Sequence, residues 1–240
     1  MFSQEVTRSG WDGLTTCSCS DRVSLLFVGP SISAAELAQI VLPGIEVRPP
    51  IKRGDLPRAL SEQNVTTVAI IDGEFFQNLA VSPKEILSAL NNNTVVIGGA
   101  SMGALRAVEL SPYGMEGIGQ VFDWYKKGIV TRDDDVALSY GVRSDSTFML
   151  CSVPMVQVMW TVQVGKRQGW LSLNSAEKTL RTARRFPWRT RTWEQILTSA
   201  SITPDEFNRL TETSVQPEND IKRLDAIATV AKLNIHHLRR

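Results

Sequence analysis

The sequence predicts an α/β fold: a mostly parallel, Rossmann-like or flavodoxin-like sheet with helices on both faces, followed by an all-helical C-terminal region. Two observations lead to this prediction. Short apolar, β-branched runs alternate with helix-period segments as far as about residue 145. Beyond that point, the periodic segments all show helical spacing or helix caps. We therefore expect a disordered tail over residues 1–21, an α/β core domain over 22–145 and a helical region over 146–240.

Turn and cap signals divide the expected core domain into its elements. Ser33 is placed to cap a helix, Gly54 turns the chain into the next one, and Pro83 suits the first position of a third. Because strands and helices alternate at this spacing, neighbouring strands should be parallel. The expected strands cover residues 22–28, 45–48, 65–71 and 94–97, and the expected helices cover residues 33–40, 55–62, 83–91, 101–110 and 120–127.

In the second half of the chain, the spacing of apolar residues and the cap signals predict helices joined by short loops. Its clearest start signal is Thr203-Pro204-Asp205-Glu206, in which a capping threonine precedes proline and two acidic residues. Residues 133–140, which read as an acidic turn with an edge strand as the alternative, separate this half from the core domain. The expected helices cover residues 148–164, 172–185, 192–200, 204–213 and 218–233.

The most informative stretch is residues 93–110, which reads strand, glycine turn, helix. Gly99-Ala100-Ser101-Met102-Gly103 fits the G-x-S-x-G nucleophile-elbow pattern in the strand-to-helix context that the pattern requires. Such a turn would present Ser101 at the carboxyl edge of the sheet, beside the N–H groups of a helix N-terminus. We therefore expect an anion or oxyanion site there.

Polar residues at the other strand ends should lie at the same edge, because ligands of open parallel sheets bind beyond the carboxyl ends of the strands. Asp72 follows one strand and Ser31 another, while Glu85 and Arg106 start or continue neighbouring helices. The candidate catalytic residues are Ser101, Asp72, Glu85 and Arg106. The candidate substrate- or anion-binding residues are Ser31, Arg53, Gly73, Gly99, Met102, Gly103 and Glu109.

Each candidate also has a structural interpretation. Ser101 can be a helix cap, and Asp72 can satisfy loop N–H groups. Arg106 and Glu109, three residues apart on a helix, can form a surface ion pair. Glu85 fits the charge pattern of a helix N-terminus. No histidine is near Ser101 in the sequence, which makes a Ser-His-Asp triad reachable only if the C-terminal tail folds back.

Two charged stretches are weaker evidence for a binding site than the strand-end residues are. Asp133-Asp134-Asp135 is more typical of a solvated loop than of a divalent-cation site, since three consecutive carboxylates do not easily face one ion. The basic run over residues 181–191, which contains Trp188, could contact nucleic acid or an acidic protein.

Composition narrows the function classes. Lys and Arg total 26 and Asp and Glu total 25, so no global charge indicates nucleic acid or a membrane surface. Cys17, Cys19 and Cys151 make neither a disulfide framework nor a four-ligand zinc site. The uncharged stretch over 146–165 contains Pro154 and two glutamines, which favours a buried helix over a membrane span. We expect a cytoplasmic protein without a secretion signal, cofactor or metal.

Several motifs resemble the TfuA-like core domain. FVGPS, RPPIKRGDL, AIIDGEFF, KEILSAL, GGASMGALRAVEL, YGMEGIG and DDDVAL occur in the family's order over about residues 24–140. The resemblance implies a partner of YcaO proteins, which use ATP to activate backbone amides, typically giving a thioamide in a ribosomally made peptide or a protein. The TfuA-like partner is thought to assist YcaO or to supply sulfur. Pro83 stands where the family usually has histidine, and Gln157 and Met159 align loosely with its Asn-x-Arg.

Two main hypotheses follow. The first is an accessory protein that aids sulfur delivery, with Ser101, or a water held by Asp72 and Glu85, attacking a thiocarboxylated sulfur-carrier protein while Arg106 or Arg53 stabilises the oxyanion. It would contact a peptide or protein substrate through the YcaO complex. The second is a non-catalytic adaptor that activates YcaO allosterically, as the missing histidine favours. A general serine esterase is a third reading, and a homodimer is left open.

Overall fold

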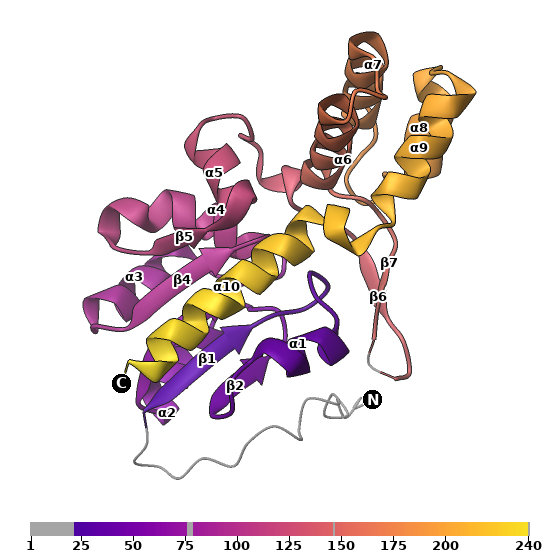
Figure 1. The fold of residues 1–240 in the computed structure, drawn as a ribbon. Coiled ribbons are helices and arrows are strands. Elements are labelled where there is room, and N and C mark those ends of the chain that lie inside the picture. The colour runs from indigo at the N-terminus through magenta and orange to yellow at the C-terminus, as the bar shows by residue number, and fades with distance from the viewer. Residues whose placement is uncertain (1–21, 76–78, 146, 240) are drawn as a thin grey trace, which may run out of the picture.

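The computed structural model describes residues 22–75, 79–145 and 147–239. The predicted disordered tail over residues 1–21, with Cys17 and Cys19, lies outside the described residues. The elements follow the expected alternation of strands and helices in the first half and of helices in the second (Figure 1).

Five parallel strands form the main sheet, in the order β2-β1-β3-β4-β5. In the register of the sheet, Leu26 of β1 lies between Val47 of β2 and Ala69 of β3. This order is that of the flavodoxin-like doubly wound fold, and it confirms the predicted fold class. The strands are β1 (Val23–Phe27), β2 (Ile45–Arg48), β3 (Val65–Ile70), β4 (Val95–Gly99) and β5 (Glu116–Ile118).

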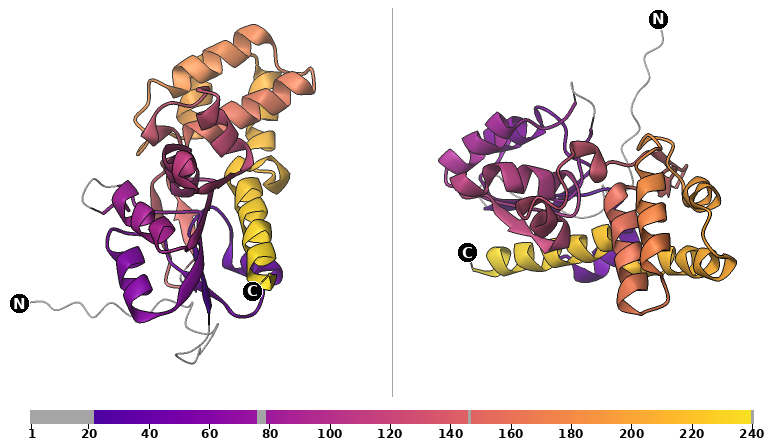
Figure 2. Two further views of the ribbon diagram at one scale, coloured as in Figure 1. Left: turned by 90° about the vertical axis from the view of Figure 1, so that its left-hand side faces the viewer. Right: turned by 90° about the horizontal axis from the view of Figure 1, so that it is seen from above.

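Helices cover both faces of the sheet because successive strand side chains point to opposite sides. Leu25 and Phe27 belong to one core with the helices α2 to α5, whereas Leu26 and Val28 belong to a second core with α1 and α10. Figure 2 shows α10 and α1 on the side of the sheet opposite α2 and α3. The helices are α1 (Ala34–Ile40), α2 (Asp55–Glu62), α3 (Pro83–Asn91), α4 (Met102–Leu110), α5 (Gly119–Lys126) and α10 (Ile221–Leu238).

Four further helices pack around a third core of their own, which contains Val158, Leu171 and Leu210. Side-chain caps start two of them: Ser172 accepts a hydrogen bond from the Ser175 N–H, and Thr203, the predicted cap, closes a capping box. These helices are α6 (Met155–Arg167), α7 (Leu173–Ala183), α8 (Trp193–Ala200) and α9 (Pro204–Ser214). Within the described ranges, we find no helix with the length and apolar character that crossing a membrane requires.

A short antiparallel hairpin, β6 (Tyr140–Val142) and β7 (Phe148–Leu150), joins the two halves. The prediction of one helix over 148–164 is therefore wrong in its first residues. Phe148 extends as a strand because its ring packs edge-on against the Tyr140 ring, 5.2 Å between centroids, and the helix begins only after Pro154.

The last helix, α10, returns from the helical half to the sheet. Ala226, Val230 and Leu233 pack into the second core, and the Asp225 carboxylate accepts hydrogen bonds of 2.8 Å from the Gln120 and Val121 N–H groups at the start of α5. The predicted boundary at residues 145 and 146 stays a prediction, but α10 packs as part of the sheet's second helical layer.

Candidate functional site

The site is built where the strand order reverses, between the carboxyl ends of β1 and β3. Asp72 follows β3 and is buried. Its carboxylate accepts hydrogen bonds from the Gly29 N–H at 2.9 Å, from the Ser31 N–H at 3.0 Å and from the Ser31 hydroxyl at 2.6 Å. Asp72 thus holds the loop after β1 against the loop after β3.

Lys222, on the first turn of α10, completes this arrangement. Its ammonium nitrogen lies 3.8 Å from Asp72 Oδ1 and donates to the Val136 carbonyl oxygen at 3.4 Å. Burial lowers the pKa of Lys222, and the carboxylates of Asp72 and Asp220 oppose that shift. Sequence reasoning missed Lys222, since only the return of α10 to the sheet brings it to Asp72. The apolar spacing of Ala226, Val230 and Leu233 was the one available signal that α10 packs on an apolar surface.

The strand-to-helix turn at Ser101 has the predicted position but a different local geometry. The left-handed residue is Ala100, with a φ of 62°, and the Ser101 N–H bonds back to the Gly99 carbonyl at 2.8 Å. Ser101 is 1% exposed, and its hydroxyl donates to the Val136 carbonyl oxygen at 3.5 Å. The Ser101 hydroxyl and the Lys222 ammonium group therefore share one carbonyl oxygen.

The turn requires glycine at residues 99 and 103 because neighbouring atoms leave no space for a side chain, and not because the backbone there has a positive φ. A Cβ on Gly99 would lie 2.1 Å from Thr229 Oγ1 of α10, and a Cβ on Gly103 would lie 1.7 Å from the Ile70 carbonyl oxygen. Glycine is needed at both positions because another element of the fold occupies the space. Met102 is buried at the start of α4, beside Gly73.

Asp72, Ser101 and Lys222 line a small recess with a volume of about 10 Å³, which is room for about one water molecule. The Tyr140 phenol also reaches it and donates to Glu74 at 3.1 Å. The recess is lined by Pro30, Pro50, Asp72, Gly73, Phe75, Ser101, Leu138, Tyr140 and Lys222.

A larger cavity of about 280 Å³ adjoins the recess and shares Pro30, Leu138 and Lys222 with it. Val153, Pro154 and Trp193 give it apolar walls, while Asp220 adds a carboxyl group whose pKa is raised by burial. Lys222 therefore lies between a recess with room for about one water molecule and a much larger cavity.

The remaining predicted residues form a second group around the start of α3. Glu85 closes the capping box with Ser82 and also accepts a hydrogen bond of 2.5 Å from the Gly54 N–H, next to Arg53. Arg106 donates to the Val81 carbonyl at 3.0 Å and pairs with Glu109 at 2.7 Å. None of these four predicted residues, Arg53, Glu85, Arg106 and Glu109, lines the recess or the larger cavity.

Comparison with known families adds an independent observation. The sequence pattern of TfuA-like proteins matches residues 72–192, which is half of the chain. The chain belongs to the TfuA-like family. No curated protein matches the chain. TfuA-like membership supports an accessory role beside a YcaO protein in thioamide formation.

The TfuA-like match begins at Asp72, contains Ser101 and ends at Thr192. It extends beyond the core-domain motifs into α6 and α7, where the sequence resemblance is loose. Lys222 lies outside the match and reaches the matched site only through the fold.

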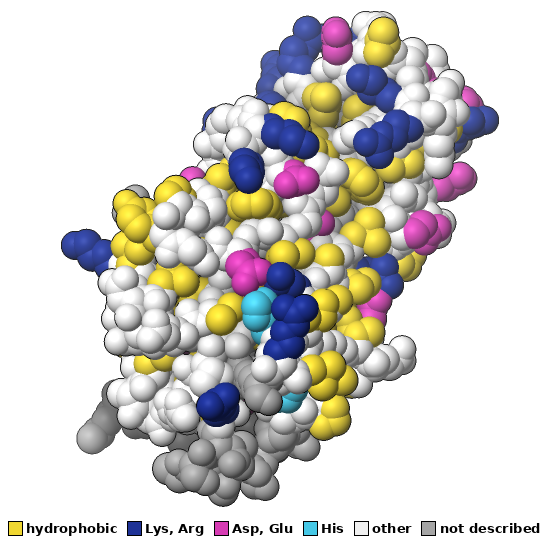
Figure 3. Space-filling view, turned by 60° about the vertical axis from the view of Figure 1, so that its left-hand side comes forward, with side chains coloured by type: hydrophobic (Ala, Val, Ile, Leu, Met, Phe, Trp, Pro, Cys, Tyr) yellow, Lys and Arg dark blue, Asp and Glu magenta, His cyan; other side chains and the backbone are white. Residues whose placement is uncertain are grey.

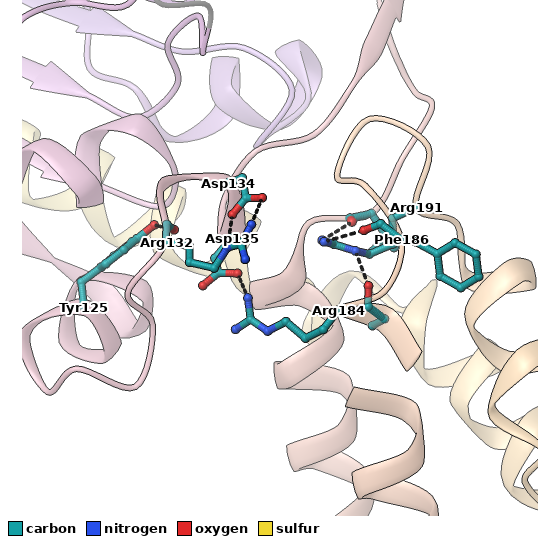
Figure 4. A network of polar contacts seen from close by, with 9 residues as sticks. Tyr125, Arg132, Asp134, Asp135, Arg184, Phe186 and Arg191 are labelled. Atoms are coloured by element: carbon teal, nitrogen blue, oxygen red, sulfur yellow. Dashed lines mark hydrogen bonds and ion pairs between the residues drawn. The ribbon is translucent and has the colours of Figure 1, made fainter. Parts of the chain in front are cut away.

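The acidic triplet of this TfuA-like protein is solvated only in part: Asp133 is exposed, whereas Asp134 and Asp135 form ion pairs (Figure 4). Asp135 is buried and pairs with Arg184 at the end of α7, while Asp134 accepts two hydrogen bonds from Arg132, at 2.8 and 2.9 Å. Among the residues that the structure describes, no cluster of His, Cys, Asp and Glu could hold a metal ion. The triplet joins the core domain to the helical half.

The C-terminal histidines lie at the other end of α10. His237 Nδ1 lies 3.0 Å from the Ser24 hydroxyl at the start of β1, and His236 lies 3.2 Å from a carboxylate oxygen of Glu116. Because α10 runs the length of the sheet, these histidines are at the opposite edge from Ser101. The TfuA-like fold therefore offers Lys222, not a histidine, as the basic residue beside the serine.

Proposed function

We propose that this TfuA-like protein aids sulfur delivery to a YcaO enzyme by hydrolysing a thiocarboxylated sulfur-carrier protein at the Ser101 recess. The observation that carries the proposal is the convergence of Ser101 and Lys222 on the Val136 carbonyl oxygen, beside the buried Asp72. A hydroxyl nucleophile next to a buried positive charge suits attack on an acyl carbon, because the charge stabilises the oxyanion that forms.

The proposed reaction converts a thiocarboxylate and water into a carboxylate and hydrogen sulfide. In the first step, the Ser101 oxygen bonds to the acyl carbon, the carbon–sulfur bond breaks, and the serine proton leaves with the sulfur as hydrosulfide. Water then cleaves the acyl ester and restores the Ser101 hydroxyl. Since the leaving sulfur accepts the serine proton, the first step does not need the histidine that Pro83 replaces.

Asp72 has a positioning role in this proposal. Its oxygens already accept three hydrogen bonds from Gly29 and Ser31, so it is poorly suited to remove a proton. Instead, its negative charge favours the protonated form of Lys222 and holds the ammonium group at the recess. The 280 Å³ cavity would admit the end of the carrier chain, and the peptide or protein substrate would stay with YcaO.

The test is sulfide release from a thiocarboxylated carrier protein by the full chain. Ser101→Ala is the decisive variant because the hydroxyl makes one long hydrogen bond, so its loss should leave the fold intact. Ser111→Ala, an exposed serine just after the same helix, is the matched control. We expect Ser101→Ala to lose release and Ser111→Ala to keep it. Full release by Ser101→Ala would remove the serine from the mechanism.

A second candidate function is a non-catalytic adaptor that activates YcaO. The burial of Ser101 and the small volume of its recess favour this reading. It predicts no sulfide release by the protein alone, but faster thioamidation when the protein is added to YcaO, with Ser101→Ala as active as the wild type. Measuring both reactions with the same preparations separates the two functions.

A further inference from the structure

The basic run predicted from the sequence lies against the acidic triplet, around a cavity that the proposed sulfur chemistry does not use. The cavity has a volume of about 210 Å³ and lies between the loop at Arg132 and the segment joining α7 to α8. On the face that Figure 3 shows, Lys and Arg side chains gather over the helical end of the molecule. The cavity is lined by Arg132, Asp134, Arg184, Arg185, Phe186, Pro187 and Arg191.

The charges around this cavity do not balance. Four arginines face it, and two aspartates neutralise part of their charge: Asp134 pairs with Arg132, and Asp135 pairs with Arg184. Figure 4 shows the two ion pairs on one side and Arg191 on the other. The positive charges of Arg185 and Arg191 are left over.

Arg191 is a buried cation that has no anionic hydrogen-bond partner among the residues that the structure describes. It is 3% exposed, and its guanidinium donates to the carbonyl oxygens of Ala183 at 2.9 Å and Phe186 at 3.2 Å, with a longer bond to Val153 at 3.5 Å. Burial lowers the pKa of Arg191, and although Asp134 opposes this shift, Arg184 adds to it by repulsion. A buried charge that is hydrogen-bonded only to neutral groups is unfavourable, and an anion in the cavity would stabilise it.

Arg185 is exposed, in contrast to the buried Arg191, and its guanidinium group is available to a ligand. Its side chain is exposed and makes no hydrogen bond or ion pair with the parts of the chain that the structure describes. Arg132 and Arg184 each spend part of their five N–H donors on an aspartate, which leaves further donors at the cavity.

We propose that this cavity binds the phosphate group of a small molecule, held by the guanidinium groups of Arg132, Arg184, Arg185 and Arg191. A dianionic phosphate matches the two uncompensated charges, and guanidinium groups bind phosphate through paired, charge-assisted hydrogen bonds. Because the cavity joins the core domain to the helical half, the bound phosphate would also brace these two parts. Inorganic phosphate and the terminal phosphate of a nucleotide share this chemistry.

Isothermal titration calorimetry of the full chain tests the proposal, with inorganic phosphate, pyrophosphate, AMP and acetate titrated separately in a chloride buffer. At least one phosphate compound should bind, and acetate should bind more weakly. Arg185→Glu should weaken binding by roughly tenfold or more, since it replaces a charge-assisted donor by a repelling charge. Arg181→Glu, which makes the same change on α7 away from the cavity lining, should leave the affinity within about twofold.

The outcomes separate clearly. Preferential binding of AMP would identify a nucleotide as the source of the phosphate, and equal or tighter binding of inorganic phosphate would identify the free ion. Absence of binding at millimolar concentrations would overturn the proposal, as would acetate binding equal to that of phosphate. Equal binding by Arg185→Glu and the wild type, with both folded by circular dichroism, would move any anion site away from this cavity. Arg132→Gln provides a second variant on the opposite wall.

Discussion

The buried pair of Asp72 and Lys222 predicts an asymmetric response to mutation. The two side chains are 4% and 5% exposed, and their charged atoms are 3.8 Å apart. Asp72→Ala removes three hydrogen bonds and the ion-pair partner of Lys222, whose buried ammonium group keeps its hydrogen bond to the neutral Val136 carbonyl. Stranding a buried charge in this way should cost about 3–5 kcal/mol of unfolding free energy.

Lys222→Met should cost much less, roughly 1–2 kcal/mol, because the remaining carboxylate keeps all three hydrogen-bond donors. The double variant Asp72→Ala/Lys222→Met no longer buries an unpaired charge and should therefore be more stable than Asp72→Ala alone. Methionine is chosen since it keeps the volume of the lysine stem in the apolar part of the site.

Urea denaturation at pH 7, followed by circular dichroism and by tryptophan fluorescence, measures these free energies. Agreement of the two probes checks that unfolding is two-state. The reasoning would be refuted if the double variant were as unstable as the sum of the single variants, since the two residues would then be energetically independent. A larger loss for Lys222→Met than for Asp72→Ala would refute it as well.

Three further predictions concern stability elsewhere in the fold. Burial alone would raise the pKa of Glu206, but hydrogen bonds from serine and threonine groups outweigh it and lower the pKa to about 2. The ionised Glu206 carboxylate therefore stabilises the fold at pH values above 4.5, its pKa in the unfolded chain, and this stabilisation is lost as the pH falls through about 2. At pH 7, Glu206→Gln should be less stable than the wild type by roughly 2–3 kcal/mol of unfolding free energy. This difference should shrink when unfolding is measured at successively lower pH. Burial raises the pKa of Asp225 to about 6, so its protonated carboxyl group stabilises the fold below pH 3.8 and this stabilisation is lost as the pH rises through about 6. Between pH 4 and pH 7, the unfolding free energy of Asp225→Asn should therefore fall less than that of the wild type. Equal slopes of unfolding free energy against pH for the two proteins would contradict this. Gly103→Ala should cost more than about 3 kcal/mol in thermal or urea unfolding because its Cβ would lie 1.7 Å from the Ile70 carbonyl oxygen; Gly141→Ala, with its nearest neighbour at 3.6 Å, is the tolerated control.

The local elements of the fold were predictable because their signals are local. Apolar runs marked four of the five strands of the main sheet, and the serine and threonine caps at Ser33, Ser82 and Thr203 lie where helices begin. The strand at Glu116–Ile118 and the hairpin strands escaped prediction because three residues are too few to establish a period. These strands form because they pair with other strands: β5 pairs with β4, which is distant in the sequence, and β6 pairs with β7 across a turn.

The candidate site was predictable in part for the same reason. Asp72 and Ser101 each follow a strand, and parallel strands place their carboxyl ends at one edge, so their proximity followed from the alternation alone. Glu85 and Arg106 looked equally suitable in the sequence. The structure instead shows them in contacts around the start of α3, which depend on how neighbouring helices pack.

The sequence by itself thus determined the fold class, the strand-to-helix turn at Ser101 and the TfuA-like relationship. Only the tertiary structure decided which charges meet. Lys222 reaches Asp72 because α10 packs its apolar face on the sheet after a long helical excursion, and Asp135 meets Arg184 across the junction of the two halves. Periodicity and caps report the conformation of a few neighbouring residues, whereas contacts between distant segments depend on how whole elements bury their apolar faces together.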